Sequence, residues 1–184
     1  MNSISKNSVA KAFTLLVCAF LFGSSAFATT YKALTLDEMV EATDLGFYGE
    51  VVGIAVEERD GDPWTVVTFD IIRALEGIEA NEDTEEDVSF AFYGGTLPSG
   101  ESLLVSLMPQ FSEGDRVLLL AHDREQYSPV VGFRQGLWRE TTLGLRDETG
   151  RLLSLDEENA LTLEGEGGGT EALLDALQER LDAR

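Results

Sequence analysis

Apolar and polar positions alternate with a period of two through the middle of the chain, which is typical of half-buried β-strands. In the stretch 64–75, Val66, Thr68 and Asp70 alternate with Val67, Phe69 and Ile71. Positions 116–121 are almost continuously apolar, as expected for a strand that is buried on both faces. Similar patterns predict further strands at 45–56, 88–93, 102–107, 127–133 and 137–142, and a small hairpin at 143–155.

The strand predicted at 45–56 is expected to bend. It is β-branched and aromatic but contains Gly46, Gly49 and Gly53, and glycines inside a strand permit sharp curvature. A curled strand can serve both sides of a small barrel. We therefore predict a mainly β fold, a small antiparallel OB-like barrel with a short N-terminal helix and a C-terminal helix. Alternation predicts that the following residues are mostly buried: Phe47, Val51, Val67, Phe69, Val117, Leu119 and Val131.

Two segments have helical patterns. Thr35 and Glu38 have the spacing of a capping box, and the apolar positions after Thr35 predict a helix over 36–43 at one end of the barrel. In 170–184 the residues Leu173, Leu174, Leu177 and Leu181 form a helical stripe, with Thr170 as the expected cap. The glycine-rich segment 164–169 is expected to be a flexible linker, so this last helix either docks on the barrel or stays loosely tethered.

The N-terminus has the organisation of a secretory signal. Lys6 and Lys11 are basic, 12–22 is an apolar run, and Ala26 and Ala28 are small residues at positions −3 and −1 of a cut before Thr29. The alternative is a retained anchor helix, for which the run is short. We expect cleavage after Ala28 and export to the periplasm or the medium, with no membrane association afterwards. The predicted organisation is a signal peptide at 1–28, a β-barrel domain at 29–163, a linker at 164–169 and a helix at 170–184.

The chain is strongly acidic. It has 34 Asp and Glu against 13 Lys and Arg, a formal charge of −21; loss of Lys6 and Lys11 leaves 34 against 11, or −23. Nucleic acids and anionic membranes attract Lys and Arg stripes, so neither is expected as a partner. The acidity serves solubility or adaptation to a salty medium, or it attracts a cationic partner or Ca²⁺.

This charge predicts a salt dependence of stability. Repulsion among the carboxylates should lower the melting temperature at low ionic strength, and added salt should raise it, because the Debye length falls from about 30 Å at 0.01 M to about 3 Å at 1 M. Thermal unfolding in increasing NaCl measures the effect, and sulfate serves as a comparison because it also strengthens apolar burial. A midpoint that NaCl leaves unchanged or lowers would mean that the acidic residues are compensated locally.

No catalytic or metal-binding motif stands out. Cys18 lies in the predicted signal, so the mature chain would have no thiol, disulfide or cysteine metal site. His122 is the single histidine, which is too few nitrogen ligands for a zinc site, and no G-x-S-x-G elbow occurs. The acidic stretch 81–87 lacks the turn-making glycine of a calcium loop. We therefore predict no catalytic residue, no metal site and no cofactor.

Two glycine-containing pairs are the best candidates for a shaped binding surface. Glycine permits positive φ and close backbone approach at Gly94-Gly95 and at Gln135-Gly136. The alternative is that both pairs are turns that need those dihedral angles. Trp138 follows three residues after Gln135 and is either an anchor for a partner or, as we favour, part of the core.

The order of landmarks resembles a family of uncharacterised secreted bacterial domains. The matching motifs span about residues 34–142 and are Asp44-Leu45 with Gly49 and Val51, Leu75-Glu76-Gly77, Gly94-Gly95, Pro109 to Leu119, and Val130 to Gly136. The resemblance implies an OB-type barrel, distantly similar to netrin/TIMP-like inhibitor domains. TIMPs clamp a protease zinc with an N-terminal cysteine, whereas Thr29 is the expected N-terminus here, so that mechanism does not transfer.

Three functions fit these observations. The first is a non-catalytic exported binding or accessory module that contacts a protein partner through barrel loops. The second is a small secreted hydrolase that uses acidic residues, and the third is a passive acidic structural protein. An enzyme should bring polar groups with shifted pKa values together in a cleft, whereas a module should have a filled interior and an exposed apolar patch.

Overall fold

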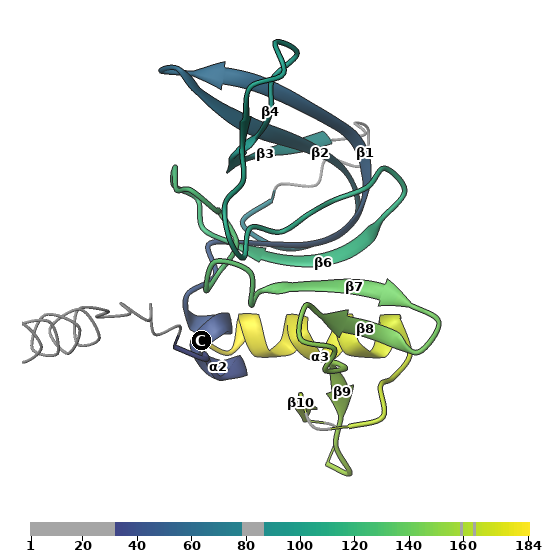
Figure 1. Cartoon of the computed structure of the whole chain (residues 1–184). Coiled ribbons are helices and arrows are strands. Elements are labelled where there is room, and N and C mark those ends of the chain that lie inside the picture. Colours follow the sequence, from purple (N-terminus) through teal and green to yellow (C-terminus); the bar gives the residue numbers. More distant parts are fainter. Residues whose placement is uncertain (1–31, 79–86, 159, 164) are drawn as a thin grey trace, which may run out of the picture. The chain divides into compact units, whose positions relative to one another are not determined.

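Antiparallel strands make up most of the regular structure, so the prediction of a mainly β fold is confirmed (Figure 1). The computed structural model describes residues 32–78, 87–158, 160–163 and 165–184. The strands are β1 (Leu45–Arg59), β2 (Asp62–Glu76), β3 (Asp87–Tyr93), β4 (Gly95–Thr96), β5 (Ser102–Leu103), β6 (Arg116–Ala121), β7 (Leu137–Thr141), β8 (Gly144–Asp147), β9 (Ser154–Leu155) and β10 (Leu161–Thr162). The helices are α2 (Leu36–Glu41) and α3 (Thr170–Asp182).

The main sheet is built around the long β1–β2 hairpin. Its strand order is β3-β2-β1-β6-β7-β8. Asp60 and Gly61 form the two-residue turn with φ of 53° and 91°, the left-handed conformation that tight hairpins require. The register between β1 and β2 shifts at three points, the last between Val51 and Gly53. Such irregularities bend a strand, and β1 and β2 curl together in Figure 1.

The sheet is covered by apolar residues on both faces. Inside the curl lies a cluster, here called the inner cluster, whose buried members include Phe47, Val51, Val67, Phe69, Phe90, Phe92, Val117, Leu119 and Leu137. Against the other face of β6 and β7 lies the helix-side cluster, which includes Leu118, Leu120 and Trp138 together with the leucines of α3. Because β6 supplies alternate residues to the two clusters, its continuous apolar run is explained. All seven residues predicted to be buried are at most 1% exposed.

A closed barrel is not found among the described residues. Among the described residues no strand pairing joins β3 to β8, so the sheet has two edges. The strand expected at 127–133 is not formed: the segment contains Pro129, and Gly132 and Phe133 have φ of 61° and 67°. Proline lacks an N–H and positive φ breaks an extended chain, so this segment turns. It makes the bridge from Val130 to Ala121 and a few further backbone hydrogen bonds to β6 and to the end of β3.

Two other strand predictions were too long. The expected strand at 102–107 is extended only at Ser102–Leu103, and Leu107 has a φ of 67°. The expected hairpin at 143–155 is only partly formed. β8 ends at Asp147, the bridge from Arg146 to Leu152 continues it, and β9 pairs instead with β10.

The N-terminal helix begins as the capping box predicts. The Glu38 backbone N–H donates to Thr35 Oγ1 at 3.2 Å, and the Thr35 N–H donates to Glu38 Oε2 at 2.9 Å. The helix ends at Glu41, two residues earlier than expected. Its buried residues Leu36, Met39 and Val40 belong to the helix-side cluster, so α2 does not plug the interior of the curl.

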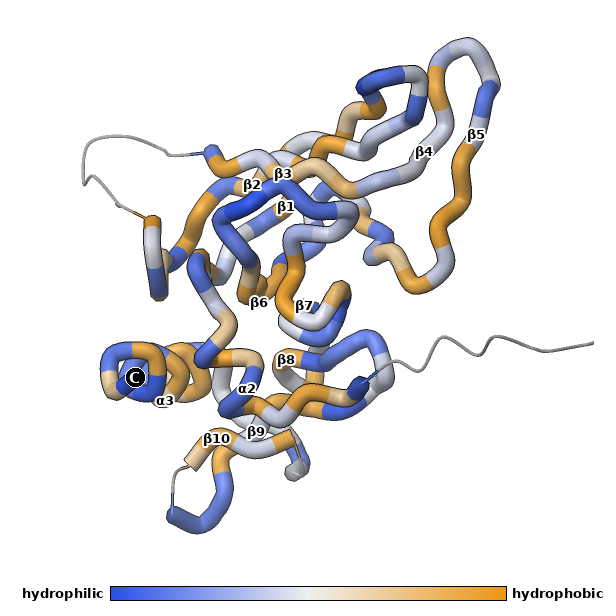
Figure 2. Tube along the Cα trace, turned by 90° about the vertical axis from the view of Figure 1, so that its left-hand side faces the viewer, coloured by the Kyte–Doolittle hydropathy of each residue, from blue (hydrophilic) through white to orange (hydrophobic). Residues whose placement is uncertain are grey.

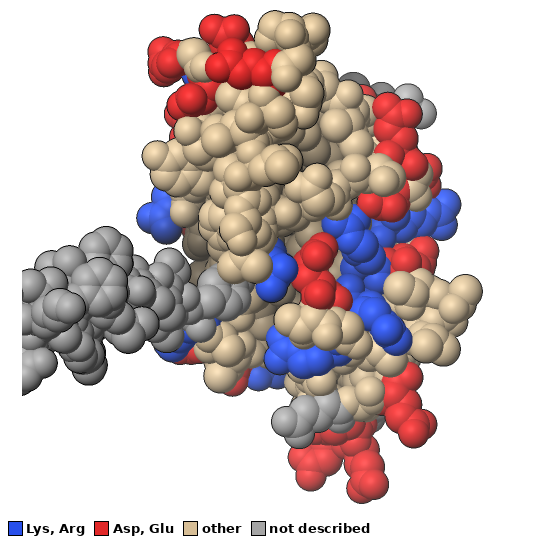
Figure 3. Space-filling view, viewed as in Figure 1, with Lys and Arg blue, Asp and Glu red and all other residues tan. Residues whose placement is uncertain are grey.

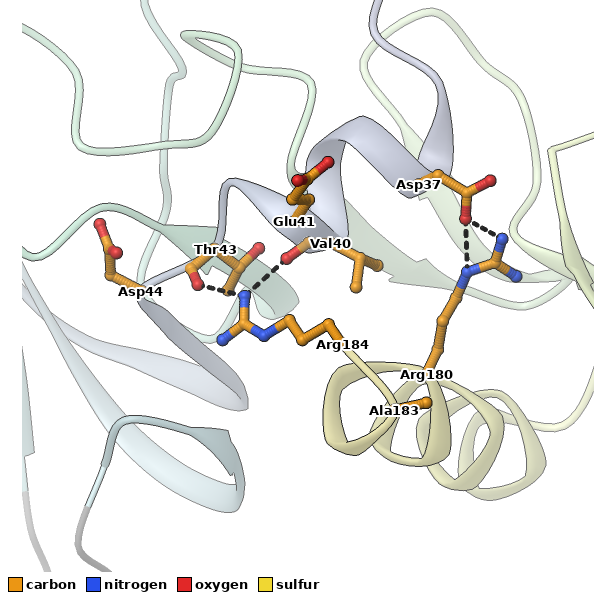
Figure 4. A pocket seen from close by; sticks show the side chains of 8 residues that line it. All are labelled: Asp37, Val40, Glu41, Thr43, Asp44, Arg180, Ala183 and Arg184. Carbon is orange, nitrogen blue, oxygen red and sulfur yellow. Dashed lines mark hydrogen bonds and ion pairs between the residues drawn. The ribbon is translucent and has the colours of Figure 1, made fainter.

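The C-terminal helix docks on the sheet. Its four leucines are buried in the helix-side cluster, and Figure 1 shows α3 on the side of β6 and β7 away from the curl. The Arg184 guanidinium donates to the carbonyls of Val40 and Thr43 at 2.7 and 2.5 Å, and Arg180 pairs with Asp37 (Figure 4). Arg184 therefore adds donors to carbonyls at and just beyond the end of α2, and the Val40 carbonyl also accepts the Thr43 N–H at 3.2 Å.

The start of α3 differs from the prediction. Gly169 is the N-cap, with no side-chain cap bond, and the Thr170 hydroxyl donates instead to Glu140 Oε1 at 3.0 Å. The glycine-containing segment before the helix is closely packed. A Cβ on Gly167 would lie 2.4 Å from the Leu143 carbonyl oxygen, and the Gly167 N–H donates to Ser154 Oγ at 2.8 Å. Glycine is needed here for close backbone approach.

A buried carboxylate organises the turn after β8. Asp147 is 7% exposed and accepts bonds from the Thr149 N–H and hydroxyl and from the Arg151 N–H and guanidinium, at 2.7–2.9 Å. Burial by itself raises the pKa of Asp147, but these hydrogen bonds and the Arg151 charge outweigh it, and the pKa is lowered.

This shift predicts acid sensitivity. A lowered folded-state pKa contributes stability that is complete above the unfolded value, about 3.9, and is lost as pH falls through the folded value. Asp147→Asn should cost about 1–3 kcal/mol at pH 7, because it removes a charge-assisted set of bonds. Denaturant unfolding of both proteins at pH 7 and at about pH 3 measures the difference, which should shrink in acid. An equal difference at both pH values would contradict this role.

Candidate functional site

Three aromatic rings meet on the outer surface where β2 begins and β3 ends. Trp64, Tyr93 and Tyr127, here called the aromatic cluster, have ring centroids 5.1 Å (Trp64–Tyr93), 4.7 Å (Tyr93–Tyr127) and 6.3 Å (Trp64–Tyr127) apart. Tyr127 is 64% exposed. The Arg59 guanidinium carbon lies 5.4 Å from the Trp64 ring centroid, and the Tyr93 hydroxyl donates to Asp62 Oδ2 at 2.9 Å. The Trp64 and Tyr127 rings are inclined by 22°, whereas Tyr93 meets them at 66° and 49°, and polar groups lie at the rim of the cluster.

Backbone hydrogen bonds hold the aromatic cluster in place. The Tyr93 N–H donates to the Tyr127 carbonyl at 2.8 Å, and the Gly94 N–H donates to the Pro63 carbonyl at 2.8 Å. The three rings therefore come from segments that are fixed to one another through main-chain atoms, which limits the entropy lost when a ligand binds.

The predicted pair Gly94-Gly95 lies beside this cluster. The two glycines have φ of 104° and 142°. A Cβ on Gly94 would lie 2.8 Å from the Leu103 carbonyl oxygen, and one on Gly95 would lie 2.7 Å from Thr65 Oγ1. Both features that the sequence suggested, positive φ and close approach, are present. Tyr93, the last residue of β3, comes directly before the pair, and Gly94 forms a bridge with Trp64.

Two depressions border the aromatic cluster. One of about 400 Å³ is lined by residues that include Trp64, Gln126, Tyr127 and Phe133. A second of about 590 Å³ shares Trp64, Glu125 and Gln126 with it and continues along β3. The side-chain nitrogen of Gln126 is buried and has no hydrogen-bond partner among the described residues. A buried donor without an acceptor is costly, so a ligand that offers one would be favoured here.

A third depression, of about 340 Å³, lies where Gly94 and Gly95 face the segment that follows β5. Leu104 and Met108 contribute to its wall, and Leu104 is 90% exposed. Figure 2 shows this segment as mostly hydrophobic, with a paler interruption between two hydrophobic stretches. Exposed apolar side chains thus also lie on the far side of the glycine pair from the aromatic cluster.

The other predicted candidates are structural. Gln135 Oε1 accepts the Leu34 N–H at 2.8 Å and so fixes the chain just before α2. A Cβ on Gly136 would lie 2.8 Å from the Leu120 carbonyl oxygen. Trp138 is 1% exposed within the helix-side cluster. The structure therefore does not bring these three residues together with Gly94 and Gly95.

The interior of the curl is filled with side chains. Phe111 closes it, with ring centroids 5.6 Å from Phe69 and 5.0 Å from Phe92. The Arg139 guanidinium carbon lies 5.2 Å from the Phe111 ring centroid, and the guanidinium pairs with Asp115 Oδ2 at 2.6 Å. Both contacts anchor the segment from Phe111 to Asp115 to β7. The inner cluster is thus a packed core.

Two of the four groups in the described chain with shifted pKa values interact with each other. Burial and a hydrogen bond to Glu140 raise the pKa of Tyr48 to about 12, and Arg116 acts on Tyr48 in the opposite direction. A hydrogen bond to Glu50 raises the pKa of Arg116, and Tyr48 and Glu140 add to that shift. A hydrogen bond to Asp62 raises the pKa of Tyr93, which is the member of this set that belongs to the aromatic cluster.

His122 Nδ1 lies 3.4 Å from Asp44 Oδ2 in the wall of the larger depression beside β3. Within the described residues, no three His, Cys, Asp or Glu side chains gather in a way that could hold a metal ion. The same part of the chain contains no helix that is both long and apolar enough to cross a membrane.

Sequence reasoning missed the aromatic cluster, although a signal for it existed. In 64–75 the polar positions Thr68 and Asp70 mark the outward face, and the same period places Trp64 outward. Tyr93 occupies an outward position in β3, because Phe90 and Phe92 point inward. Tyr127 had no such signal, since it lies in a turn whose position depends on the tertiary structure.

No protein-family model matches the sequence, and a search of curated proteins finds no match.

Proposed function

We propose that this protein is a non-catalytic, exported binding module and that a protein partner contacts it at the aromatic cluster. The observation that carries the proposal is the exposure of Tyr127, at 64%, beside two other rings and two depressions. Tyrosine and tryptophan are the residues that most often carry binding energy at interfaces, because a rigid ring buries a large area with little loss of entropy.

The alternative of a hydrolase receives less support. A glycosidase needs two carboxyl groups at a defined separation, one with a raised pKa. The carboxylate in the described chain with a shifted pKa is Asp147, whose pKa is lowered and whose oxygens are occupied by Thr149 and Arg151. A filled interior with aromatic residues on the surface fits a module better.

Two finer features are part of the same proposal. We infer export from the signal-like N-terminus, and we regard the curl of β3, β2, β1 and β6 around the inner cluster as an OB-like half-barrel. The resemblance to secreted netrin/TIMP-like domains is supported by sequence landmarks alone. Detection of the mature protein outside the cytoplasm, beginning at Thr29, would test the first of these inferences.

The binding role can be tested with displayed random peptides, both linear and disulfide-cyclised, selected on the mature chain. Selected peptides should bind Tyr127→Ser at least about tenfold more weakly, since loss of a central tyrosine at an interface typically costs 2 kcal/mol or more. Leu143→Ser is the matched control, because Leu143 is 60% exposed at the β7–β8 turn, outside the cluster. Failure to select any peptide, or equal binding to both variants, would overturn the proposal.

A further inference from the structure

The outer edge of β3 has unpaired backbone groups. Arg59 and Asp62 flank a two-residue turn, so they form a hydrogen-bonded pair, and alternation then directs the backbone of Thr65 and Val67 toward β3. Their partners in β3 are Phe92 and Phe90. The N–H and C=O groups of Ser89 and Ala91 therefore point away from the sheet. The bond from the Tyr93 N–H to the Tyr127 carbonyl, on the same side of the strand, agrees with this direction.

A groove runs along this edge. It is the depression of about 590 Å³, and it has Val88 to Ala91 on one side and His122 to Gln126 on the other. The Tyr93–Tyr127 bond closes one end of it. Among the described residues, no strand beyond β2 pairs with β3. The segment 127–133, which was expected to be a strand, turns instead and leaves a groove along the edge of β3.

The edge also lacks the usual protection against pairing. Natural edge strands are blunted by lysine, proline or a bulge. β3 reads Asp87-Val-Ser-Phe-Ala-Phe-Tyr93, with neither lysine nor proline, and its pairing with β2 has no register shift. A regular edge of this kind is a template for an added strand, which is the way several recognition domains bind peptides.

Charge indicates which peptide would fit. Glu50, Asp70 and Asp87 lie opposite one another across three strands, and within the part of the chain that the structure describes only Glu50 of the three has a cationic partner, Arg116 at 2.9 Å. Like charges on directly opposed strands repel. At the other end of the edge lies the β1–β2 turn region, with Glu57, Glu58, Asp60 and Asp62 around Arg59, which Figure 3 shows as an acidic surface at the upper end of the molecule.

We propose that an extended segment of a partner protein, bearing lysine or arginine, adds to β3 as a further strand. Its backbone would pair with Ser89 and Ala91, and its basic side chains would lie near Asp87 at one end and Asp62 at the other. Side chains between them would contact Trp64 and offer an acceptor to Gln126. This inference rests on the proposed binding function and names the class of ligand.

The first test compares two synthetic peptides of equal β propensity, the acetylated octapeptide amides (Val-Lys)4 and (Val-Glu)4. In an NMR titration at low salt, the lysine peptide should shift the amide signals of Ser89 and Ala91. It should also bind at least about tenfold more tightly than the glutamate peptide, because like charges oppose association. Its affinity should fall as NaCl is added. Equal binding of both peptides would overturn the choice of a basic ligand.

The second test addresses backbone pairing. N-methylation of alternate residues removes donors from one edge of the lysine peptide, so one alternating set should abolish binding and the other should leave it intact. On the protein, Ala91→Pro removes an outward N–H that makes no bond to β2, and proline is tolerated at such edge positions. Ala91→Ser keeps the N–H and is the matched control. We expect Ala91→Pro to lose binding at least about tenfold, a factor that corresponds to 1.4 kcal/mol.

The outcomes separate the two proposals. If displayed peptides depend on Tyr127, but the lysine peptide tolerates both N-methylation sets and binds Ala91→Pro as well as the unchanged chain, strand addition is wrong and the binding function stands. If neither the library nor the lysine peptide binds, both proposals fail. If sedimentation shows that the free chain pairs with a second copy and Ala91→Pro abolishes that dimer, the occupant is this chain itself and a basic partner is wrong. If Ala91→Pro does not fold, the N-methylated peptides still decide whether the lysine peptide pairs with the backbone of β3.

Discussion

Removal of residues 170–184 should leave a chain that does not fold cooperatively. Helix α3 buries four leucines in the helix-side cluster, and burial of each such side chain is worth about 1.5–3 kcal/mol. The total is comparable to the whole stability of a typical domain, about 5–15 kcal/mol. Deletion would also expose the outer faces of Leu118 and Trp138. Circular dichroism and the dispersion of the NMR spectrum would measure the loss of structure.

A smaller change in the same helix separates packing from chain length. Leu177→Ala should destabilise the full chain by about 2–5 kcal/mol, since Leu177 is 1% exposed. Glu179→Ala on the exposed face of α3 is the control and should change stability by less than about 0.5 kcal/mol. A deletion variant that unfolds at the same denaturant concentration as the full chain would show that α3 is only tethered.

The second large effect is expected at the centre of the inner cluster. Phe69 is fully buried, and its ring centroid lies 5.3 Å from that of Phe47 and 5.6 Å from that of Phe111. Phe69→Ala should therefore cost about 3–5 kcal/mol, because neighbouring rings cannot collapse fully into the space that it leaves. The midpoint of urea unfolding should fall while the slope stays unchanged.

Ile72→Ala provides a comparison on the same strand. Ile72 is 48% exposed, so its truncation should change the free energy of unfolding by less than about 0.5 kcal/mol. If the two variants were equally destabilised, β2 would not be oriented with Phe69 toward the core. The pair thus tests the inner cluster and the strand orientation together.

The aromatic cluster and the edge of β3 depend on the same local event. The segment 127–133 turns at Gly132 and Phe133 instead of extending, and this leaves β3 without a second neighbour. The same segment presents Tyr127 to Trp64 and Tyr93 through the bond at the end of β3. A closed barrel would have removed both features, so the proposed binding surface depends on the open edge of the sheet.

Local pattern was sufficient for much of the fold. Strand-like patterns located β1, β2, β3 and β7, because alternation reflects the burial of one face of a strand. A continuous apolar run located β6, which is buried on both faces. The capping box located the start of α2, since its hydrogen bonds join residues three apart in the chain. Of the candidate site, the sequence identified Gly94 and Gly95, because glycine permits positive φ and close backbone approach.

Only the tertiary structure decided how the elements combine. Whether the sheet closes depends on the path of 127–133, where Pro129 and two residues of positive φ outweigh an apolar pattern that alone predicts a strand. The docking of α3 depends on the outer faces of β6 and β7, which lie far from it in sequence. Trp64, Tyr93 and Tyr127 come from separate segments, and the assignment of Trp138 to the core needed its neighbours. Periodicity records which face of an element is buried, whereas contacts between distant segments leave no mark on the local pattern.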